Sequence, residues 1–176
     1  MFYLSLLLAT GFAFQSAPTQ TAAATEPPAR PAISTQERGD IFMARKMYRE
    51  AVDTYKQAPA SALMLNKIGI AYHQMTDLDT ARKYYERAIK TDPQYAEAIN
   101  NLGTIFYARK SYRRAITEYK KALRIAPESA SAWANLGSAY FARKNFETAS
   151  DAYQHALALD PEVFERHSTT GSTVQE

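Results

Sequence analysis

Three stretches of this chain can be laid over one another at a constant spacing of about 34 residues. Gly69, Gly103 and Gly137 are separated by this distance, and a proline follows each of them at the same interval. A fixed period of this length is the signature of a repeat array, in which each unit buries its apolar face against its neighbours. The chain is therefore predicted to fold as a row of similar units.

Each unit is predicted to contain two helices. Apolar and small residues recur at spacings of three and four in both halves of a unit, which places one apolar stripe on each helix. In residues 130–163 these positions are Trp133, Leu136, Gly137, Tyr140, Phe146, Ala149, Tyr153 and Ala156. The break from Arg143 to Asn145 is long enough only for an antiparallel turn. Asp160 and Pro161 end the unit, and we expect Asp160 to cap the next helix with Pro161 in its first position.

This pattern resembles the tetratricopeptide repeat (TPR) family, whose helix-turn-helix unit reads W-x2-L-G-x2-Y…A-x3-F…A…P. The resemblance covers three consecutive units, at residues 62–95, 96–129 and 130–163. It implies an all-α protein, built as a right-handed α-solenoid of antiparallel helix pairs that is known as a TPR superhelix.

A truncated TPR-like unit is predicted upstream, at residues 35–61. Its glycine, Gly39, lies closer to Gly69 than the repeat period requires, and Pro59 comes early. The second helix should therefore be shorter by about one turn. Thr35 and Arg38 stand where the family has Trp and Leu. We expect a frayed or partial first helix, in keeping with a terminal capping unit.

The N-terminal residues 1–24 are predicted to form a signal peptide or an N-terminal anchor. Residues 2–14 are an apolar run, too short for a membrane span of about 20 residues. The run fits the core of a secretory signal, and Ala22 and Ala24 give an A-x-A cleavage pattern. Because no Lys or Arg precedes the run, an uncleaved anchor stays open as the alternative. We expect an exported protein of the periplasm or cell envelope, with membrane association only through this segment.

Two further segments are predicted to lie outside the repeats. Residues 25–34 are rich in Ala, Thr and Pro and are expected to form a disordered linker. Residues 164–176 are expected to add a short helical end and a disordered tail, and Val163, the last residue of the repeat, is expected to cover the last unit together with Phe164. Because no full solvating helix follows, the C-terminal face is a candidate for weak self-association.

Composition and motifs argue against catalysis. The chain has no cysteine, and its six glycines are scattered rather than gathered in a phosphate-binding loop. His73, His155 and His167 have no partner at metal-ligand spacing, and no serine stands in a nucleophile elbow. The net charge of +3 is a mild excess that does not specify nucleic acid. We therefore expect no enzyme activity, no metal or other cofactor, no small-molecule substrate and no nucleic-acid partner.

The resemblance implies a binding groove. Proteins of the TPR family typically hold an extended peptide or a partner helix in a concave groove lined by the first helix of each unit. By the family's phase, the lining positions are Leu63, Asn66, Lys67, Ile70, His73 and Gln74, then Glu97, Asn100, Asn101, Thr104, Tyr107 and Ala108, then Ser131, Ala134, Asn135, Ser138 and Phe141. Such a polar lining suits a peptide held through its backbone with one or two apolar anchors. The candidate peptide-binding residues are Asn66, Lys67, His73, Asn100, Asn101, Thr104, Tyr107, Asn135, Ser138 and Phe141.

Asn101 and Asn135 are the sharpest candidates because each directly precedes a Leu-Gly pair. In family members with a long peptide-binding superhelix, asparagines at this position grip the peptide backbone. A carboxamide offers both a donor and an acceptor, as a peptide unit requires. The basic positions that clamp the acidic tail of chaperones in other members are not matched here, so we expect a different kind of peptide.

Basic pairs recur at the end of each first helix, as Arg45-Lys46, Arg109-Lys110 and Arg143-Lys144. Cations there stabilise a helix C-terminus by about 0.3–1 kcal/mol each, and a basic edge that attracts acidic surfaces is the functional alternative. The leading hypothesis is a non-catalytic adaptor that binds a peptide or helix of a protein partner in the groove. The alternative is a structural subunit that self-associates through its C-terminal face.

Overall fold

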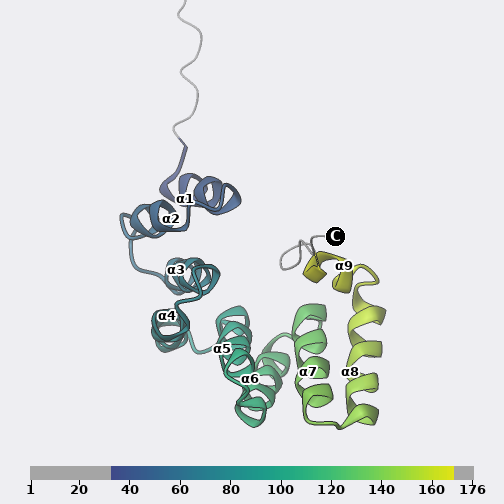
Figure 1. Cartoon of the computed structure of the whole chain (residues 1–176). Helices are drawn as coiled ribbons and strands as arrows, with labels where there is room; N and C mark the ends of the chain where they lie inside the picture. The colour runs from purple at the N-terminus through teal and green to yellow at the C-terminus, as the bar shows by residue number, and fades with distance from the viewer. Residues whose placement is uncertain (1–32, 169–176) are drawn as a thin grey trace, which may run out of the picture. The chain divides into compact units, whose positions relative to one another are not determined.

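The computed structural model describes residues 33–168, with side chains up to residue 165, and every element in this part of the chain is an α-helix (Figure 1). The predictions for residues 1–32 and 169–176 lie outside the described residues. The helices are α1 (Thr35–Ala44), α2 (Tyr48–Tyr55), α3 (Ala62–Gln74), α4 (Leu78–Thr91), α5 (Ala96–Ala108), α6 (Tyr112–Ile125), α7 (Ala130–Ala142), α8 (Phe146–Leu159) and α9 (Val163–Ser168).

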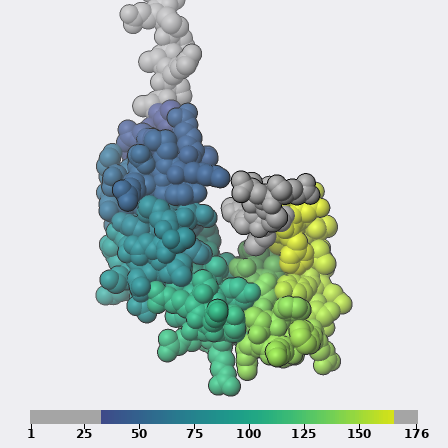
Figure 2. Space-filling model, in the orientation of Figure 1, coloured from purple at the N-terminus to yellow at the C-terminus, as the bar shows by residue number. Residues whose placement is uncertain are grey.

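The helices pack as antiparallel pairs that follow one another in chain order (Figure 1). In the space-filling view, the colour of the described residues passes steadily from purple to yellow along the array (Figure 2). The pairs are α1 with α2, α3 with α4, α5 with α6 and α7 with α8, and the second helix of each pair packs on the first helix of the next. The first helices also touch directly, α3 with α5 and α5 with α7. The predicted all-α solenoid is therefore confirmed.

A glycine and a tyrosine close each helix pair. Gly103 on α5 lies against the ring of Tyr119 on α6, and a methyl group at Gly103 would stand only 2.6 Å from Tyr119 Cε1. The same contact joins Gly39 to Tyr55, Gly69 to Tyr85 and Gly137 to Tyr153. The rings of Tyr55, Tyr85 and Tyr119 are each about 1% exposed, so the glycine leaves room for a large buried side chain where two helices approach closely.

The turn inside each pair is a Schellman motif, which satisfies the last carbonyl groups of the first helix. At the end of α3, the Thr76 N–H donates to the His73 carbonyl at 2.9 Å and the Asp77 N–H to the Tyr72 carbonyl at 3.0 Å. The residue at the turn must be left-handed, and Lys46, Thr76, Lys110 and Lys144 have φ between 57° and 62°. The basic pairs thus consist of a C-capping Arg and a left-handed Lys.

The first unit differs from its prediction in part. Helix α1 has 10 residues against 13 in α3, so it is shorter than the first helices of the complete units. Helix α1 is not frayed: the Ser34 hydroxyl accepts from the Glu37 N–H, and the Glu37 carboxylate accepts from the Ser34 N–H, forming a capping box. The S-x-x-E signature was present in the sequence and was missed. Helix α2 has 8 residues against 14 in α4, so the shortening exceeds the single turn expected from Pro59.

The Asp-Pro corner between units also differs from its prediction. Asp92 is the C-cap of α4, and its carboxylate accepts from the Gln94 N–H at 2.9 Å, while α5 begins only at Ala96. Asp160 makes the same contact with the Glu162 N–H. The aspartate therefore shapes a turn instead of capping the following helix. Beyond it, Val163 packs on α7 and α8, where Ala134 and Ala156 are buried with it.

Candidate functional site

A polar hollow of about 440 Å³ lies along the first helices of the three complete units. Helices α3, α5 and α7 supply most of its lining, and the second helix α4 supplies one residue, Tyr85. The lining residues are Ile70, His73, Gln74, Tyr85, Glu97, Asn100, Asn101, Thr104, Ser131 and Asn135. All of these except Tyr85 belong to the groove positions inferred from the sequence. The structure therefore brings residues from three units around one space.

Asparagine side chains link the units along this hollow. The Asn101 Nδ2 donates to Asn66 Oδ1 at 3.0 Å, and the Asn135 Nδ2 donates to Asn100 Oδ1 at 3.1 Å. Each bond joins residues 35 apart, one on each of two successive first helices. We call these four residues the asparagine ladder. It explains why α3, α5 and α7 keep a defined rotation, because buried amides must be paired.

Two of the predicted groove residues serve the solenoid itself. Asn66 has no exposed surface and Asn100 is 8% exposed, and Asn66 Nδ2 also donates to Glu97 Oε1 at 3.0 Å. Their side chains are therefore structural, and the prediction that Asn66 contacts a ligand is wrong because no surface remains for it. Asn101 and Asn135 are half-buried, and their carbonyl oxygens have no hydrogen-bond partner among the described residues.

The Thr and Ser hydroxyls of two first helices accept hydrogen bonds from tyrosine hydroxyls of the second helices. Tyr119 Oη donates to Thr104 Oγ1 at 3.4 Å, and Tyr153 Oη donates to Ser138 Oγ at 3.2 Å. In the first unit Tyr55 Oη donates to Asp40 Oδ1 at 2.5 Å. Acceptor and donor are 15 residues apart in every case. Thr104 and Ser138 thus have an internal role that the sequence analysis did not foresee.

Tyr85 is the lining residue that the sequence analysis missed. The residue 15 positions before Tyr85 is Ile70, whose side chain has no polar atom that could accept a hydrogen bond. The Tyr85 hydroxyl has no hydrogen-bond partner among the described residues. The sequence carries a signal for this difference. The residue 15 positions before the core tyrosine is polar in the other units, where it is Asp40, Thr104 or Ser138, and it is apolar only before Tyr85.

Two titratable side chains border the hollow. Burial lowers the pKa of His73 below its ordinary value, so its ring is neutral at pH 7 and offers one donor and one acceptor. Glu97 is exposed, and its carboxylate accepts from Asn66 and, through Oε2, from the Tyr95 hydroxyl at 3.0 Å. Among the residues that line the hollow, Glu97 alone carries a charge.

Lys67 lies outside the hollow and joins the first two units. Its Nζ is 2.7 Å from Asp40 Oδ1 and 5.8 Å from the centre of the Tyr55 ring. Burial by itself disfavours the charged form of Asp40, but the hydrogen bonds from Lys67 and Tyr55 outweigh it and keep the pKa of Asp40 below its ordinary value. Lys67 therefore acts first as an ion-pair partner.

The aromatic candidates Tyr107 and Phe141 also lie outside the hollow. Each stands at the end of a first helix against the first aromatic residue of the second helix, with ring centroids 5.4 Å apart for Tyr107 and Tyr112 and 5.2 Å for Phe141 and Phe146. Tyr107 is half-buried, whereas Phe141 is 57% exposed. These aromatic contacts join the two helices on either side of the turn in the last two units.

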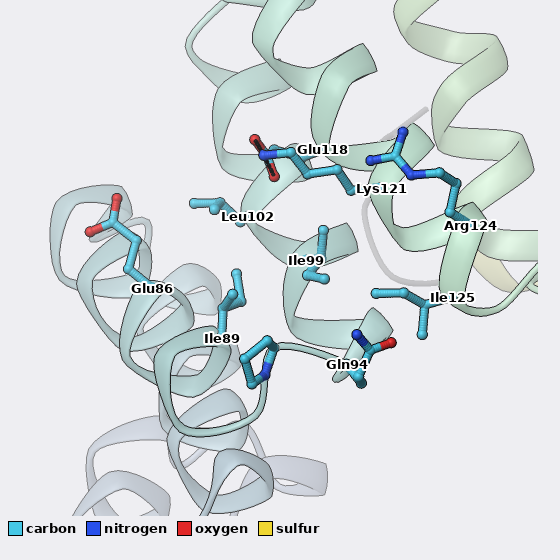
Figure 3. Close-up of a pocket in the computed structure, with 10 residues that line it drawn as sticks. Glu86, Ile89, Gln94, Ile99, Leu102, Glu118, Lys121, Arg124 and Ile125 are labelled. Atoms are coloured by element: carbon cyan, nitrogen blue, oxygen red, sulfur yellow. Dashed lines mark hydrogen bonds and ion pairs between the residues drawn. The ribbon is translucent and has the colours of Figure 1, made fainter.

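A second cleft of about 600 Å³ lies between the second helices α4 and α6, and the first helix α5 also contributes to its lining (Figure 3). Its base is apolar, with Ile89, Ile99 and Leu102, and Glu86 and Arg124 stand at its edge. The predicted peptide-binding groove lies on the first helices, and the sequence did not predict this cleft.

The described part of the chain shows neither a metal centre nor a membrane span. Among the side chains of residues 33–165 there is no group of three or more His, Asp or Glu placed to hold a metal ion. No helix in that range is long and apolar enough to cross a membrane.

Known proteins resemble this chain in sequence and in structure. A curated relative, the uncharacterized protein ycf37 of Guillardia theta, is 32% identical over an alignment of 68 residues, and the match covers 34% of this chain and 38% of that protein. The match therefore spans well under half of that relative's length. The crystal structure of MamA aligns with a TM-score of 0.64 and 22% identity, covering 74% of this chain and 79% of that one.

A further solved structure is that of YrrB, described as a TPR protein with an unusual peptide-binding site. It aligns with a TM-score of 0.62 and 19% identity over 78% of this chain and 73% of that one. At this identity the likeness establishes the fold alone.

Family models cover most of the described residues. Models described as tetratricopeptide repeat match residues 32–94 and 130–163, and one described as TPR repeat matches residues 103–143. These matches agree with the helix pairs, the glycine–tyrosine contacts and the solenoid stacking described above. The chain belongs to the tetratricopeptide repeat family.

Proposed function

We propose that this protein is a non-catalytic interaction adaptor that binds an extended segment of a partner protein in the polar hollow. The observation that carries the proposal is the convergence of α3, α5 and α7 on one open space lined by amide and hydroxyl groups. The YrrB structure, described as having a peptide-binding site on the same fold, supports it.

The asparagine ladder prepares the hollow for a peptide backbone. Asn101 and Asn135 each use one N–H in the ladder, so their second N–H and their carbonyl oxygen stay available. A peptide unit presents one N–H and one C=O, which such an amide can satisfy together. Because the ladder already holds both side chains in place, little conformational entropy is lost on binding.

We place this activity outside the cytoplasm. The apolar run at residues 2–14 and the A-x-A pattern at Ala22 to Ala24 support export to the periplasm or cell envelope. Membrane association would then occur only through residues 1–24. Fractionation of cells that produce the full chain, with N-terminal sequencing of the product, tests this placement; a cytoplasmic product that retains residue 2 would refute it.

The hollow is tested with the double variant Asn101→Ala/Asn135→Ala. We expect it to lose capture of partners from solubilised cell envelope, while circular dichroism stays helical. The control is Gln154→Ala, an exposed amide on α8 that lies away from the hollow. Equal capture by the double variant, the control and the wild type would reject binding in the hollow.

A second role, self-association through the last unit, is favoured by one observation. Phe146 is 57% exposed, and Leu157 and Leu159 on α8 are 43% and 46% exposed. Apolar side chains of this size gathered on a terminal unit are typical of interaction surfaces. Sedimentation over a wide concentration range decides this role: a monomer at every concentration refutes it, and a dimer that Leu157→Ser abolishes supports it.

A further inference from the structure

The Tyr85 hydroxyl is a donor that the solenoid leaves unused. Tyr85 is 1% exposed, yet its Oη has no acceptor within the described part of the chain, whereas Tyr55, Tyr119 and Tyr153 each donate to the residue 15 positions earlier. At that position Tyr85 meets Ile70. The hydroxyl is not among the buried polar atoms that lack a partner, so it reaches the hollow. A donor that opens onto the hollow and that no protein group uses can bond an acceptor that a ligand supplies.

This unused donor lies where a ligand can reach it. Tyr85 and Ile70 both line the polar hollow. Burial, together with the nearby Glu97 carboxylate, raises the pKa of the Tyr85 phenol well above its ordinary value. The phenol therefore keeps its proton, and it can serve as a donor throughout the physiological range.

The charge of the residues that line the hollow indicates which ligand side chain it favours. The hollow carries one charge, that of Glu97, and no Lys or Arg is among the residues that line it. His73 is neutral at pH 7, because its burial lowers its pKa. The closest basic candidate from the sequence, Lys67, is held by Asp40 at 2.7 Å. The hollow is thus an acidic spot on a chain whose net charge is +3.

We infer that the hollow selects an extended peptide segment that carries a Lys or Arg. The cation of that side chain pairs with the Glu97 carboxylate, and a backbone carbonyl next to it accepts the hydrogen bond of the Tyr85 hydroxyl. The inference rests on the proposed function and narrows it. It also separates this hollow from a clamp for acidic tails, which requires basic lining residues.

The test uses the full-length chain and two synthetic libraries of seven-residue peptides, one with Lys or Arg at the central position and one with Glu there. We expect the basic library to bind about tenfold more tightly by fluorescence anisotropy, the ratio that a single charged hydrogen bond provides. Glu97→Gln should remove this preference, and Glu97→Lys should reverse it. Thermal melts of both variants show whether the fold is intact, and Glu97→Gln retains an acceptor for Asn66.

The donor is tested separately with Tyr85→Phe. We expect about fivefold weaker binding of the basic library, the loss that follows from one neutral hydrogen bond. The control is Tyr84→Phe, whose ring stacks on Tyr72 with centroids 5.5 Å apart and does not line the hollow. Unchanged binding by Tyr84→Phe together with weaker binding by Tyr85→Phe supports the inference.

The outcomes separate this inference from the proposed function. Peptides that bind with equal affinity whatever their charge, but lose affinity in Asn101→Ala/Asn135→Ala, would overturn the basic specificity and leave binding in the hollow standing. Binding that Tyr85→Phe does not weaken overturns the role of the Tyr85 donor. If neither library binds, or if binding ignores the asparagine variants, the proposed function fails and the inference fails with it.

Discussion

The contact between Gly103 and Tyr119 allows a quantitative prediction. Replacing Gly103 by Ala would place a methyl group 2.6 Å from Tyr119 Cε1 and 2.7 Å from Cδ1. Ordinary contact begins near 3.4 Å, so the ring must retreat by about 0.8 Å. Tyr119 is 1% exposed, and its hydroxyl is bonded to Thr104. The ring therefore has little freedom to move, and the added methyl group acts as overpacking.

Two opposing terms set the size of the effect. Overpacking a well-filled core costs about 1–3 kcal/mol, while Ala is favoured over Gly inside a helix by about 1 kcal/mol. We therefore expect Gly103→Ala to lower the free energy of unfolding by up to about 2 kcal/mol. Urea denaturation followed by circular dichroism measures this change, provided that the slope of the transition is unchanged.

A double-mutant cycle isolates the contact. Tyr119→Leu removes the ring atoms that the methyl group would meet, so in this background Gly103→Ala should be neutral or stabilising. The coupling free energy between the two positions should then be about 1–3 kcal/mol. A Gly103→Ala single variant that is more stable than the wild type would refute the reasoning, because propensity alone would then govern this position.

Three other predictions follow from the turns, the ladder and the carboxylates. Thr76→Gly should raise the thermal midpoint by a few degrees, because a β-branched residue at φ 61° is strained by roughly 1 kcal/mol; a lower midpoint would contradict this. Asn66→Ala should destabilise the chain by roughly 2 kcal/mol or more in urea denaturation, since Asn101 and Glu97 lose a buried partner; a loss below about 0.5 kcal/mol would show that the ladder is not structural. The pKa of Asp40 is lowered in the folded chain, so the stability it contributes is present above about pH 4 and is lost as the pH falls further. The midpoint should therefore drop less between pH 6 and pH 3 in Asp40→Asn than in the wild type, and equal drops would exclude this contribution.

Local features of the fold could be predicted from the sequence because they depend on short-range periodicity. The repeat period placed the helix pairs, and the glycine and tyrosine positions within it marked the closest contacts. Errors arose where a cap decides the boundary. The Ser34 capping box starts α1 cleanly, and the turn at Asp92 delays α5 to Ala96, because side-chain hydrogen bonds override the general pattern.

The candidate site was predicted only in part. The sequence identified which helices face the hollow, and Asn101 and Asn135 lie there. It could not separate a ligand-facing amide from a structural one, and Asn66 belongs to the second kind. Adjacent positions on a helix differ by about 100° in direction, so the choice between them depends on how the next unit is rotated.

The sequence by itself determined the repeat, its two helices and the residues that close each pair, since all of these follow from spacings within one unit. Only the tertiary structure decided which side chains meet between units. The bonds from Asn101 to Asn66 and from Asn135 to Asn100 span 35 residues and depend on the rotation between neighbouring pairs. The same is true of the hollow that Tyr85 and Glu97 line together. Local periodicity does not encode that rotation, because it arises from the packing of one unit against the next.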